Sequence, residues 1–556
     1  MAHTPPNGAQ ALVESLLIHG ADTGFCVPGE SYLAVLDALY DVRERFKLVV
    51  CRQEGGAAYM ADAYGKLTGK PGIAFVTRGP GATNASVGVH TAFQDSSPMI
   101  LFIGQVAREA LEREAFQEID YRRMFGQMAK WVAQIDDARR IPEFVSHAFH
   151  IATSGRPGPV VLALPEDMLH DACEVAPPQP YRRIAAAPRP QDMAELQAML
   201  EAAERPLMIL GGRGWTHDAC ADMRRFAENW RLPVACAFRY QDLFDSEHAQ
   251  YVGDVGLGIN PRLKARIQQA DLVLAVGPRL GESTTSGYEL FDIPRPQQKL
   301  VHVHAGVEEL GRVYAADLPI NAGYPEFALQ AASLLPGAAP RWAGLTDEAR
   351  QQYLSWSEPT ATPGAVQMGE IMRWLCARLP ADAIVTNGAG NYAIWLHRFF
   401  RYRQFATQLA PTSGSMGYGV PAAVAAKIVT PARMVVSFSG DGCFLMNGQE
   451  LGTAVKYNAA VVFIVVNNGM YGTIRMHQER NYPERVIATE LANPDFAALA
   501  RAYGAHGEVV EATADFAPAF ERAVTAGRPA LIELRVDPEA ITPATTITQL
   551  RQAAQR

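Results

Sequence analysis

Short, continuous apolar runs alternate along the whole chain with longer segments in which apolar residues recur at helical spacing. Apolar runs of about four to eight residues, bounded by glycine, proline or polar residues, are typical of strands buried in a parallel sheet. The segment 30–42, ESYLAVLDALYDV, is one of the intervening amphipathic helices. This alternation predicts doubly wound α/β domains with right-handed crossovers. We interpret as strands the runs 25–29, 48–52, 72–77, 99–104, 160–165, 207–212, 233–238, 272–277, 300–305, 383–388, 433–440, 460–468 and 530–536.

The alternation falls into three blocks, separated by two stretches of loose composition. Residues 176–191, APPQPYRRIAAAPRPQ, are rich in proline and are interpreted as a linker. Residues 335–352, LPGAAPRWAGLTDEARQQ, close the middle block and are also interpreted as loose chain. At roughly 150 residues per domain, a chain of this length has room for about three or four domains. We expect three α/β domains, at 1–175, 192–335 and 360–545.

The composition is that of an ordinary soluble protein and gives no sign of a nucleic-acid or membrane partner. Of 556 residues, 48% are apolar and 19% are charged, and the net charge of −8 favours neither nucleic acid nor an anionic membrane as partner. Seven cysteines occur without a CxxC pair, so we expect buried thiols in a reducing compartment. The N-terminus lacks the basic start of a secretory signal, and no apolar run approaches the roughly 18 residues of a membrane span. We therefore expect a cytoplasmic protein.

Two of the apolar runs end in side chains suited to a metal ion. The run 433–440 is followed by Asp441, and the run 460–468 ends in Asn468. Ligands of open α/β sheets bind beyond the carboxyl ends of strands, and the separation of 27 residues (468 − 441) matches about one strand–helix–strand unit. A carboxylate, an amide oxygen and a backbone carbonyl suit Mg²⁺, which completes its octahedron with phosphate and water. The alternative is an N-cap aspartate and a turn-forming asparagine pair.

The spacing resembles the cofactor motif of thiamine diphosphate (ThDP) enzymes, in which GDG is followed after 24 residues by NN. The resemblance covers nearly the whole chain, which is identified as a divergent member of the acetolactate synthase (acetohydroxyacid synthase large subunit) family. It implies a pyrimidine-binding, a central and a diphosphate-binding domain, of the pyruvate oxidase and decarboxylase type. The sequences that carry it are RQEGGAAYMADAYGKLTGKPGIAFVTRGPGATNASVGVHTAFQDSSPMILFIGQV, AFQEIDYRRMFGQMAKW, IATSGRPGPVVLALPEDML, TSGSMGYGVPAAVAAK and NPDFAALARAYGAHG.

The resemblance implies a role for each residue of the cofactor site. Glu54 matches the glutamate at N1′ of the aminopyrimidine, where an acid promotes loss of the C2 proton of the thiazolium ring; alone, it would also fit a solvated helix start. The carbonyl of Gly414 would accept from the 4′-amino group, and Met416 would be the apolar wedge between the rings. The expected metal ligands are Asp441, Asn468 and the carbonyl of Met470. Cofactor contacts are expected from Glu54, Asn387, Gly388, Gly390, Asn391, Gly414, Met416, Gly440, Asp441, Gly442, Cys443, Asn468, Met470, Tyr471 and Gly472.

Members of the family decarboxylate pyruvate and join the remaining fragment to a second 2-oxo acid. Phe116 and Gln117 match residues near the reacting carbons, although Phe116 alone would equally fit core packing. A tryptophan that favours 2-oxobutyrate as acceptor corresponds to His477, which puts that selectivity in doubt and offers a hydrogen-bond donor instead. Further candidates for the substrate pocket are the loop 79–84, His90 and Gln94. For both histidines the alternative is a packed or surface ring.

Biosynthetic members also bind a non-catalytic FAD in the central domain, and this chain departs from their pattern there. Their RFDDR segment is RLGES here, at 279–283, and a strand that ends in IDID is VHVHAG, with His302 and His304. A Met-His-Gly triplet is replaced in DVGLGIN, at 254–260. These departures put FAD binding in doubt, and we expect a structural role for the central domain.

The resemblance also implies an assembly, because each family site is shared between the pyrimidine domain of one chain and the diphosphate domain of another. We expect a homodimer or a homotetramer. A separate regulatory subunit is neither implied nor excluded.

Four hypotheses about function follow. The first is an acetolactate synthase-like transferase, a carboligase that acts on small 2-oxo acids such as pyruvate. The second is a ThDP-dependent decarboxylase or lyase that releases a free aldehyde. A catalytically silent binding module is disfavoured by the retained Glu54, Asp441 and Asn468. An NAD-dependent dehydrogenase would need GxGxxG after the first strand, which CVPGESYL does not provide.

Overall fold

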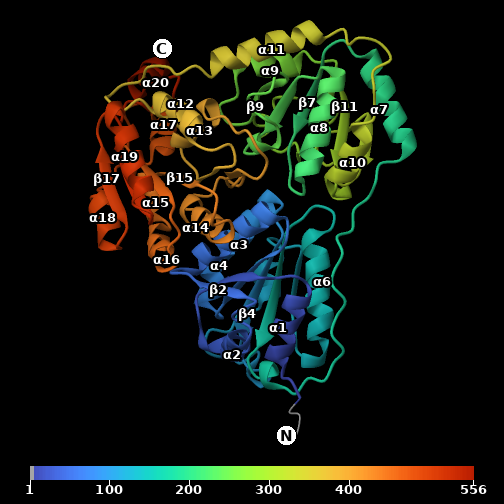
Figure 1. Cartoon of the computed structure of the whole chain (residues 1–556), viewed down its shortest axis with the longest axis vertical. Helices are drawn as coiled ribbons and strands as arrows, with labels where there is room; N and C mark the ends of the chain where they lie inside the picture. The colour runs from blue at the N-terminus through green and yellow to red at the C-terminus, as the bar shows by residue number, and fades with distance from the viewer. Residues whose placement is uncertain (1–4, 556) are drawn as a thin grey trace. The chain divides into compact units, whose positions relative to one another are not determined.

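Parallel sheets carry the fold, as the alternation of runs and helices predicts. In this computed structural model, which describes residues 5–555, eighteen strands form three six-stranded sheets (Figure 1). Every pairing between these strands is parallel. The chain divides into two units, one of Met1–Ile184 with Val424–Val429 and one of Ala185–Ala423 with Thr430–Arg556. The first unit holds one sheet, and the second unit holds two.

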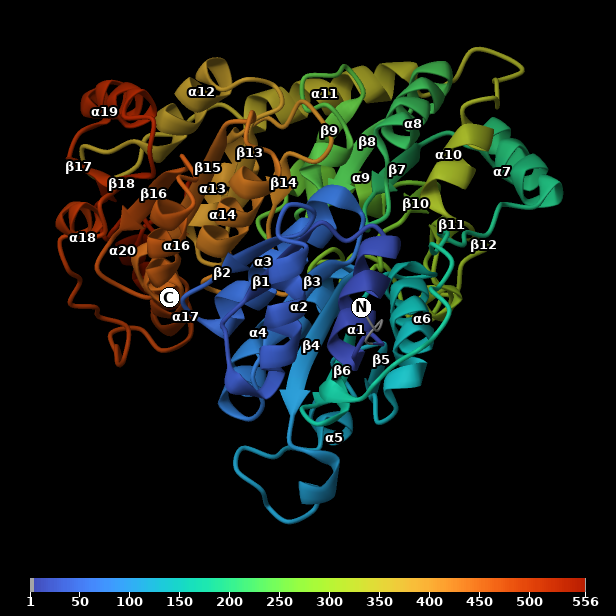
Figure 2. The same cartoon turned by 60° about the horizontal axis from the view of Figure 1, so that its bottom comes forward.

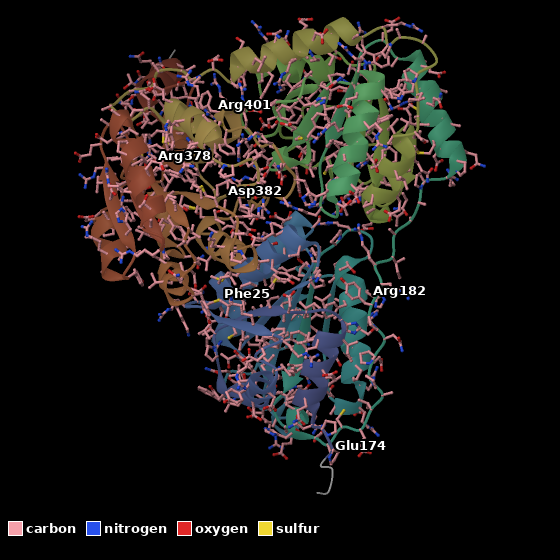
Figure 3. All side chains as sticks on the ribbon, in the orientation of Figure 1. Phe25, Glu174, Arg182, Arg378, Asp382 and Arg401 are labelled. Atoms are coloured by element: carbon pink, nitrogen blue, oxygen red, sulfur yellow. The ribbon has the colours of Figure 1, made fainter. Side chains whose placement is uncertain are left out.

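The first sheet has the strand order β2-β1-β3-β4-β6-β5. Helices α1, α2 and α6 pack on one face of this sheet, and α3 and α4 lie together on the other (Figure 2). Phe25 of β1, labelled in Figure 3, is fully buried. The strands are β1 Thr23–Cys26, β2 Lys47–Val50, β3 Gly72–Val76, β4 Met99–Gln105, β5 Trp131–Gln134 and β6 Pro159–Pro165. The helices are α1 Gly8–Ile18, α2 Leu33–Asp41, α3 Glu54–Thr68, α4 Pro80–Asp95, α5 Tyr121–Phe125 and α6 Ile141–Thr153.

The central sheet has the order β12-β11-β10-β7-β8-β9, so the strand order reverses between β7 and β10. Its strands are β7 Pro206–Leu210, β8 Val234–Ala237, β9 Tyr251–Val255, β10 Leu272–Val276, β11 Lys299–His304 and β12 Leu318–Asn321. The helices are α7 Pro190–Ala202, α8 His217–Trp230, α9 Pro261–Gln268, α10 Tyr324–Ala331 and α11 Ala343–Trp356. The prediction of loose chain over 335–352 is wrong from residue 343 onward, because Thr346, Ala349 and Tyr353 recur at helical spacing and bury one face of α11.

The C-terminal sheet has the order β14-β13-β15-β16-β18-β17. Its strands are β13 Ile384–Asn387, β14 Gln408–Leu409, β15 Val435–Gly440, β16 Val462–Asn467, β17 His506–Val510 and β18 Ala530–Arg535. The helices of this part of the chain are α12 Met368–Arg378, α13 Tyr392–Phe399, α14 Gly419–Val429, α15 Asp441–Leu445, α16 Leu451–Lys456, α17 Gly472–Asn481, α18 Phe496–Ala502, α19 Thr513–Thr525 and α20 Ile547–Ala554. Within residues 5–555, no helix combines the length and the apolar character that crossing a membrane requires.

The loop after β8 joins the central sheet to the C-terminal sheet. Arg239 is buried and donates through its guanidinium to the carbonyl of Pro411 and, at 2.9 Å, to that of Gly388. The Asp242 carboxylate accepts the backbone N–H groups of Thr407 and Gln408, at 3.0 and 3.1 Å. Polar groups at β14 and at the end of β13 are therefore satisfied by the central domain.

Candidate functional site

The pairing of β15 with β16 brings Asp441 and Asn468 to one edge of the C-terminal sheet. Gly440 is in register with Val466, so each of the two candidate ligands follows its strand at nearly the same level. Asp441 begins α15 and is 3% exposed. Its Oδ2 accepts a hydrogen bond from Nδ2 of Asn493 at 2.7 Å. The structure thus confirms that adjacent parallel strands bring Asp441 and Asn468 to the same edge of the sheet.

The two asparagines at the end of β16 have different tasks. Oδ1 of Asn467 accepts the N–H of Gly469 at 3.1 Å and Nδ2 of Asn493 at 3.0 Å, and its own Nδ2 donates to Glu533 at 2.8 Å. Asn467 is therefore a structural link between strands. Oδ1 of Asn468 accepts the N–H of Met470 at 3.2 Å, and its side chain lines a cavity.

The cavity at this edge has a volume of about 250 Å³. It brings together most of the residues that the sequence assigned to the cofactor, namely Gly390, Asn391, Gly414, Met416, Gly440, Asp441, Gly442, Cys443, Asn468, Met470, Tyr471 and Gly472. Asn387 and Gly388 do not contribute to the lining. Asn387 is fully buried, and its side chain donates to the carbonyl of Gly388. The N–H of Gly388 donates to the Tyr392 hydroxyl at 3.0 Å. Both residues therefore contact the residues that line the cavity without lining it themselves.

The electrostatics of the cavity suit a cation. Burial raises the pKa of Asp441, and the hydrogen bond from Asn493 opposes that shift only in part. A buried carboxylate without a positive partner is costly, and a divalent cation would remove the cost. The residues between 5 and 555 contain no group of three or more His, Cys, Asp or Glu side chains arranged for a metal. The available donors are one carboxylate, one amide oxygen and the Met470 carbonyl, a hard set that fits Mg²⁺ completed by phosphate oxygens.

The far wall of the cavity comes from α17 and the C-terminal segment. Asn391 links them: its Nδ2 donates to the carbonyl of Ile541 at 3.1 Å, and its Oδ1 accepts from the Thr473 hydroxyl at 2.9 Å. All three residues line the cavity. Sequence reasoning missed Thr473, Ile541 and Asn493. The segment beginning NPDF was recognised in the sequence, but no pattern indicated that its asparagine would hold Asp441.

A buried ion pair holds α20 against α17. Glu479 of α17 has a fully buried side chain and contacts Arg475 at 3.1 Å and Arg551 of α20 at 2.7 Å. It also accepts the N–H of Glu484 at 3.0 Å. The hydrogen bond from Arg551 is the main reason that the pKa of Glu479 falls to about 2. The pair therefore steadies the helix whose first turn lines the cavity.

We expect Glu479→Gln to lower the free energy of unfolding near neutral pH by about 3 kcal/mol, because α17 and α20 lose their charged contact. The folded pKa of about 2 lies below the ordinary value of 4.5, so the stabilisation is complete above pH 4.5 and is lost as the pH falls through the folded value. Melting temperatures of parent and variant should therefore converge as the pH is lowered from about 6 toward about 2.

The matched control is Glu511→Gln, since Glu511 pairs with Arg535 at the surface, where both side chains are about half exposed or more. Such pairs contribute little, so this variant should follow the parent closely as the pH is changed. A gap between parent and Glu479→Gln that does not change with pH would contradict the assignment.

In the first unit, Glu54 lies just beyond the carboxyl end of β2, at the start of α3. It is the first residue of α3, whose N-cap Gln53 accepts the N–H of Gly56 at 3.0 Å. The Glu54 side chain is half-buried, and its Oε2 accepts from Nδ2 of Asn84 at 2.9 Å. Glu54 is therefore held in one orientation with its carboxyl group partly open to solvent.

The side chain of Phe116 is 72% exposed, so the alternative of core packing is wrong. Gln117 lies against Gly79, the residue that precedes α4, and its Oε1 is buried. His90 and Gln94 are exposed on α4, and His477 is exposed on α17 without lining the cavity. For the two histidines the alternative of a packed ring is therefore wrong, and the choice lies between a surface and a substrate role.

Aromatic side chains of the central domain pack at the place where open α/β sheets bind a dinucleotide. In open α/β sheets that place is the crevice where the strand order reverses, here between β7 and β10. A Cβ at Gly212 would lie 2.3 Å from the carbonyl oxygen of Gly277 and 2.9 Å from the hydroxyl of Tyr324. Tyr324 is 1% exposed, donates to the Gly277 carbonyl at 3.3 Å and stacks on Trp215. Two buried aromatic side chains of the central domain therefore pack where the strand order reverses.

The two histidines of β11 lie in the interior of the same domain. Nε2 of His302 donates to the carbonyl of Pro278 at 2.9 Å, and burial lowers the pKa of this ring. Nδ1 of His304 accepts the N–H of Gly306 at 3.0 Å. Both rings are buried, so they form part of the core of the central domain.

Comparison with known proteins shows similarity along most of the chain. Three models of thiamine pyrophosphate enzymes match: the N-terminal TPP binding domain over 6–124, the central domain over 193–331 and the C-terminal TPP binding domain over 388–534. The chain is 34% identical to the acetolactate synthase large subunit of Parasynechococcus marenigrum, covering 90% of this chain and 83% of the relative. It is 32% identical to the acetolactate synthase of Arthrospira platensis, over 95% and 94%. It is 29% identical to the acetolactate synthase isozyme 2 large subunit of Escherichia coli, over 96% of both chains.

Proposed function

Because this chain belongs to the thiamine pyrophosphate enzymes of the acetolactate synthase family, we propose that it is a ThDP- and Mg²⁺-dependent carboligase. It decarboxylates a 2-oxo acid such as pyruvate and joins the remaining fragment to an acceptor carbonyl. The observation that carries the proposal is the cavity at the ends of β15 and β16, which both the Asp441 carboxylate and the Asn468 amide line.

The cavity would hold the diphosphate half of the cofactor. Asp441, Asn468 and the carbonyl of Met470 would bind Mg²⁺, which would offset the negative charge of the diphosphate. Backbone N–H groups at the start of α15 favour negative charge at the same place. Gly440, Gly442 and Gly472 line the cavity, and the rings of Tyr392 and Tyr471 pack against Gly440 and Gly442.

Other residues would orient the rings of the cofactor. When bound, ThDP supplies the nucleophilic carbon and the electron sink that decarboxylation of a 2-oxo acid needs. The Gly414 carbonyl would accept from the aminopyrimidine, and Met416 would separate the two rings. Glu54 would hold a proton at the pyrimidine nitrogen, since Asn84 fixes one of its carboxylate oxygens and leaves the other available. Phe116, Gln117 and His477 would contact the donor or the acceptor.

The distribution of these residues supports a shared site. Glu54 lies in the first unit and Asp441 lies in the second. As the resemblance implies, the Glu54 of one chain would serve the diphosphate cavity of another, in a homodimer or a homotetramer. We further propose the domain boundaries 1–175, 192–335 and 360–545, and a cytoplasmic location.

The test is a panel of 2-oxo acids, given to purified protein with ThDP and Mg²⁺, with and without aldehyde or 2-oxo acid acceptors. Released CO₂ and products are followed by mass spectrometry. Acetolactate or another ligated product would establish the carboligase. Carbon dioxide with free aldehyde alone would replace this proposal by the second candidate, a decarboxylase or lyase.

We propose that FAD is not a cofactor of this enzyme, because the segments 279–283 and 300–305 depart from the flavin-binding pattern and Tyr324 packs on Trp215 where the strand order reverses. The protein, purified from cells supplied with riboflavin, is expected to show no flavin absorption, and added FAD is expected to keep its fluorescence. A known flavoprotein, purified in the same way, controls for loss of flavin during purification. A stoichiometric amount of FAD released on heating would contradict the proposal.

A further inference from the structure

The loop 107–120, between β4 and α5, holds an unusual backbone. Three of its non-glycine residues have positive φ: Glu112 at 62°, Glu114 at 52° and Gln117 at 67°. This region is sparsely populated by such residues, so surrounding contacts must hold them there. Figure 2 shows this segment extending as a loop beyond the carboxyl end of β4.

The loop is fixed through its backbone. The Glu118 carboxylate accepts the N–H groups of Glu112 and Ala115, at 2.7 and 3.0 Å. A contact from the sheet adds to these bonds, since Nε2 of Gln105, the last residue of β4, donates to the carbonyl of Ile119 at 2.9 Å. The loop is therefore tied to itself and to the strand that leads into it.

Arg78 ties the same loop to two other strands. It follows β3 and is 8% exposed. Its Nε donates to the carbonyl of Phe116 at 3.1 Å, and its terminal nitrogen donates to Glu166, just after β6, at 2.8 Å. The planar guanidinium makes both contacts at fixed angles, which a lysine could not do. Arg78 thus fixes the peptide of Phe116 relative to the sheet.

The next residue, Gly79, completes the support. Its φ of 59° is unfavourable for other residues, and a Cβ there would lie 2.7 Å from Cβ of Gln117. Its N–H donates to the hydroxyl of Tyr121 at 2.9 Å, at the start of α5. The turn from β3 into α4 therefore positions both sides of Phe116.

We infer that Arg78 is a positioning residue that directs the exposed side chain of Phe116 and so selects the acceptor. The backbone at 116 is anchored, yet its aromatic ring is 72% exposed, so the contacts serve to present the ring rather than to bury it. The inference rests on the carboligase proposed above. Phe116 would recognise the apolar substituent of a small carbonyl acceptor, and Arg78 would act only through Phe116.

The test compares Arg78→Gln, Glu166→Gln, Phe116→Ala and the double variant Arg78→Gln/Phe116→Ala. Arg113→Gln, an exposed arginine of the same loop, is the matched control. Amide hydrogen exchange over 112–118 is expected to rise about tenfold in Arg78→Gln, because the Phe116 carbonyl loses its hydrogen-bond donor. The rise should be smaller in Glu166→Gln, because Arg78 is kept and loses only its ion-pair partner. Because Glu166→Gln keeps Arg78, it still tests the inference if the Arg78→Gln variant does not fold.

Kinetics then separate positioning from a general loss of structure. Arg78→Gln is expected to raise KM for the acceptor about tenfold, with a much smaller change in kcat at saturating acceptor. The double variant is expected to match Phe116→Ala alone, since one residue acts through the other.

Additive effects of the two substitutions, or unchanged exchange over 112–118, would overturn the inference. Failure of the proposed function has a different signature, because the parent itself would then yield no ligated product. In that case the proposed contact between Phe116 and an acceptor is overturned as well. If the parent ligates normally and the Arg78 variant ligates equally well, only the role of Arg78 is overturned.

Discussion

Glu54→Gln is expected to keep ThDP and Mg²⁺ bound while losing a factor of about 10²–10⁴ in turnover, the usual contribution of a general acid or base. Glutamine has the shape of glutamate and can still accept the hydrogen bond that Asn84 makes at 2.9 Å, so the start of α3 should not change. It cannot hold the proton that an acid would hold at the pyrimidine ring. The measurement is kcat together with the rate at which C2 of bound ThDP exchanges its proton, followed by NMR after acid quenching.

The control for this substitution is Glu44→Gln, an exposed glutamate in the turn before β2. It should match the parent in both rates. The proton-exchange measurement needs no knowledge of the substrate, so it tests Glu54 even where the 2-oxo acid has not been found. Near-normal turnover and exchange in Glu54→Gln would remove this residue from the mechanism.

Asp441→Ala is expected to abolish Mg²⁺-dependent binding of ThDP, because it removes the carboxylate of the proposed metal site. In the parent, cofactor at about 100 times its Kd should stabilise the fold by about 2.7 kcal/mol, seen as a rise in Tm. That rise should be absent in the variant. Without cofactor, the Tm of the variant should be at least that of the parent. Burial raises the pKa of Asp441, so its negative charge is unfavourable in the folded protein and its removal should not destabilise the fold.

Asp515→Ala is the matched control, because Asp515 is an exposed aspartate in the first turn of α19, outside the cavity. It should retain the full cofactor-dependent rise. Isothermal titration with ThDP, at fixed Mg²⁺, gives the affinity directly. If Asp441→Ala binds ThDP as well as the parent does, the metal assignment is wrong.

The apolar runs predicted thirteen of the strands and missed β5, β9, β12, β14 and β17, and the missed strands share one property. Every one of them is at an edge of its sheet. Interior strands of a parallel sheet are buried on both faces and therefore form continuous apolar runs. Edge strands are shorter, partly exposed or interrupted by polar residues, as in HGEVV of β17, so their sequences carry no such run. Among the edge strands only β2 was found, through LVV.

The part of the candidate site that depends on the pairing of β15 with β16 was predictable from the sequence. Asp441 and Asn468 are one strand–helix–strand unit apart, and adjacent parallel strands bring them together whatever the side chains between them. Asn493 and Ile541 were not predictable, because they arrive from loops whose path depends on tertiary packing. The same holds for Arg78: its arginine is visible in the sequence, but its bond to the Phe116 carbonyl spans 38 positions.

The contact between Asp242 and β14 limits how this chain could be cut. A fragment that begins at residue 360 would contain every residue that lines the cavity. It would also uncover the edge strand β14, since the N–H of Gln408 in this strand and that of the preceding Thr407 donate to Asp242. Open edges recruit strands from other molecules, which leads to aggregation. The central domain therefore covers this edge of the C-terminal sheet within the same chain. The C-terminal part would need the central domain for this reason even if the central domain binds no cofactor.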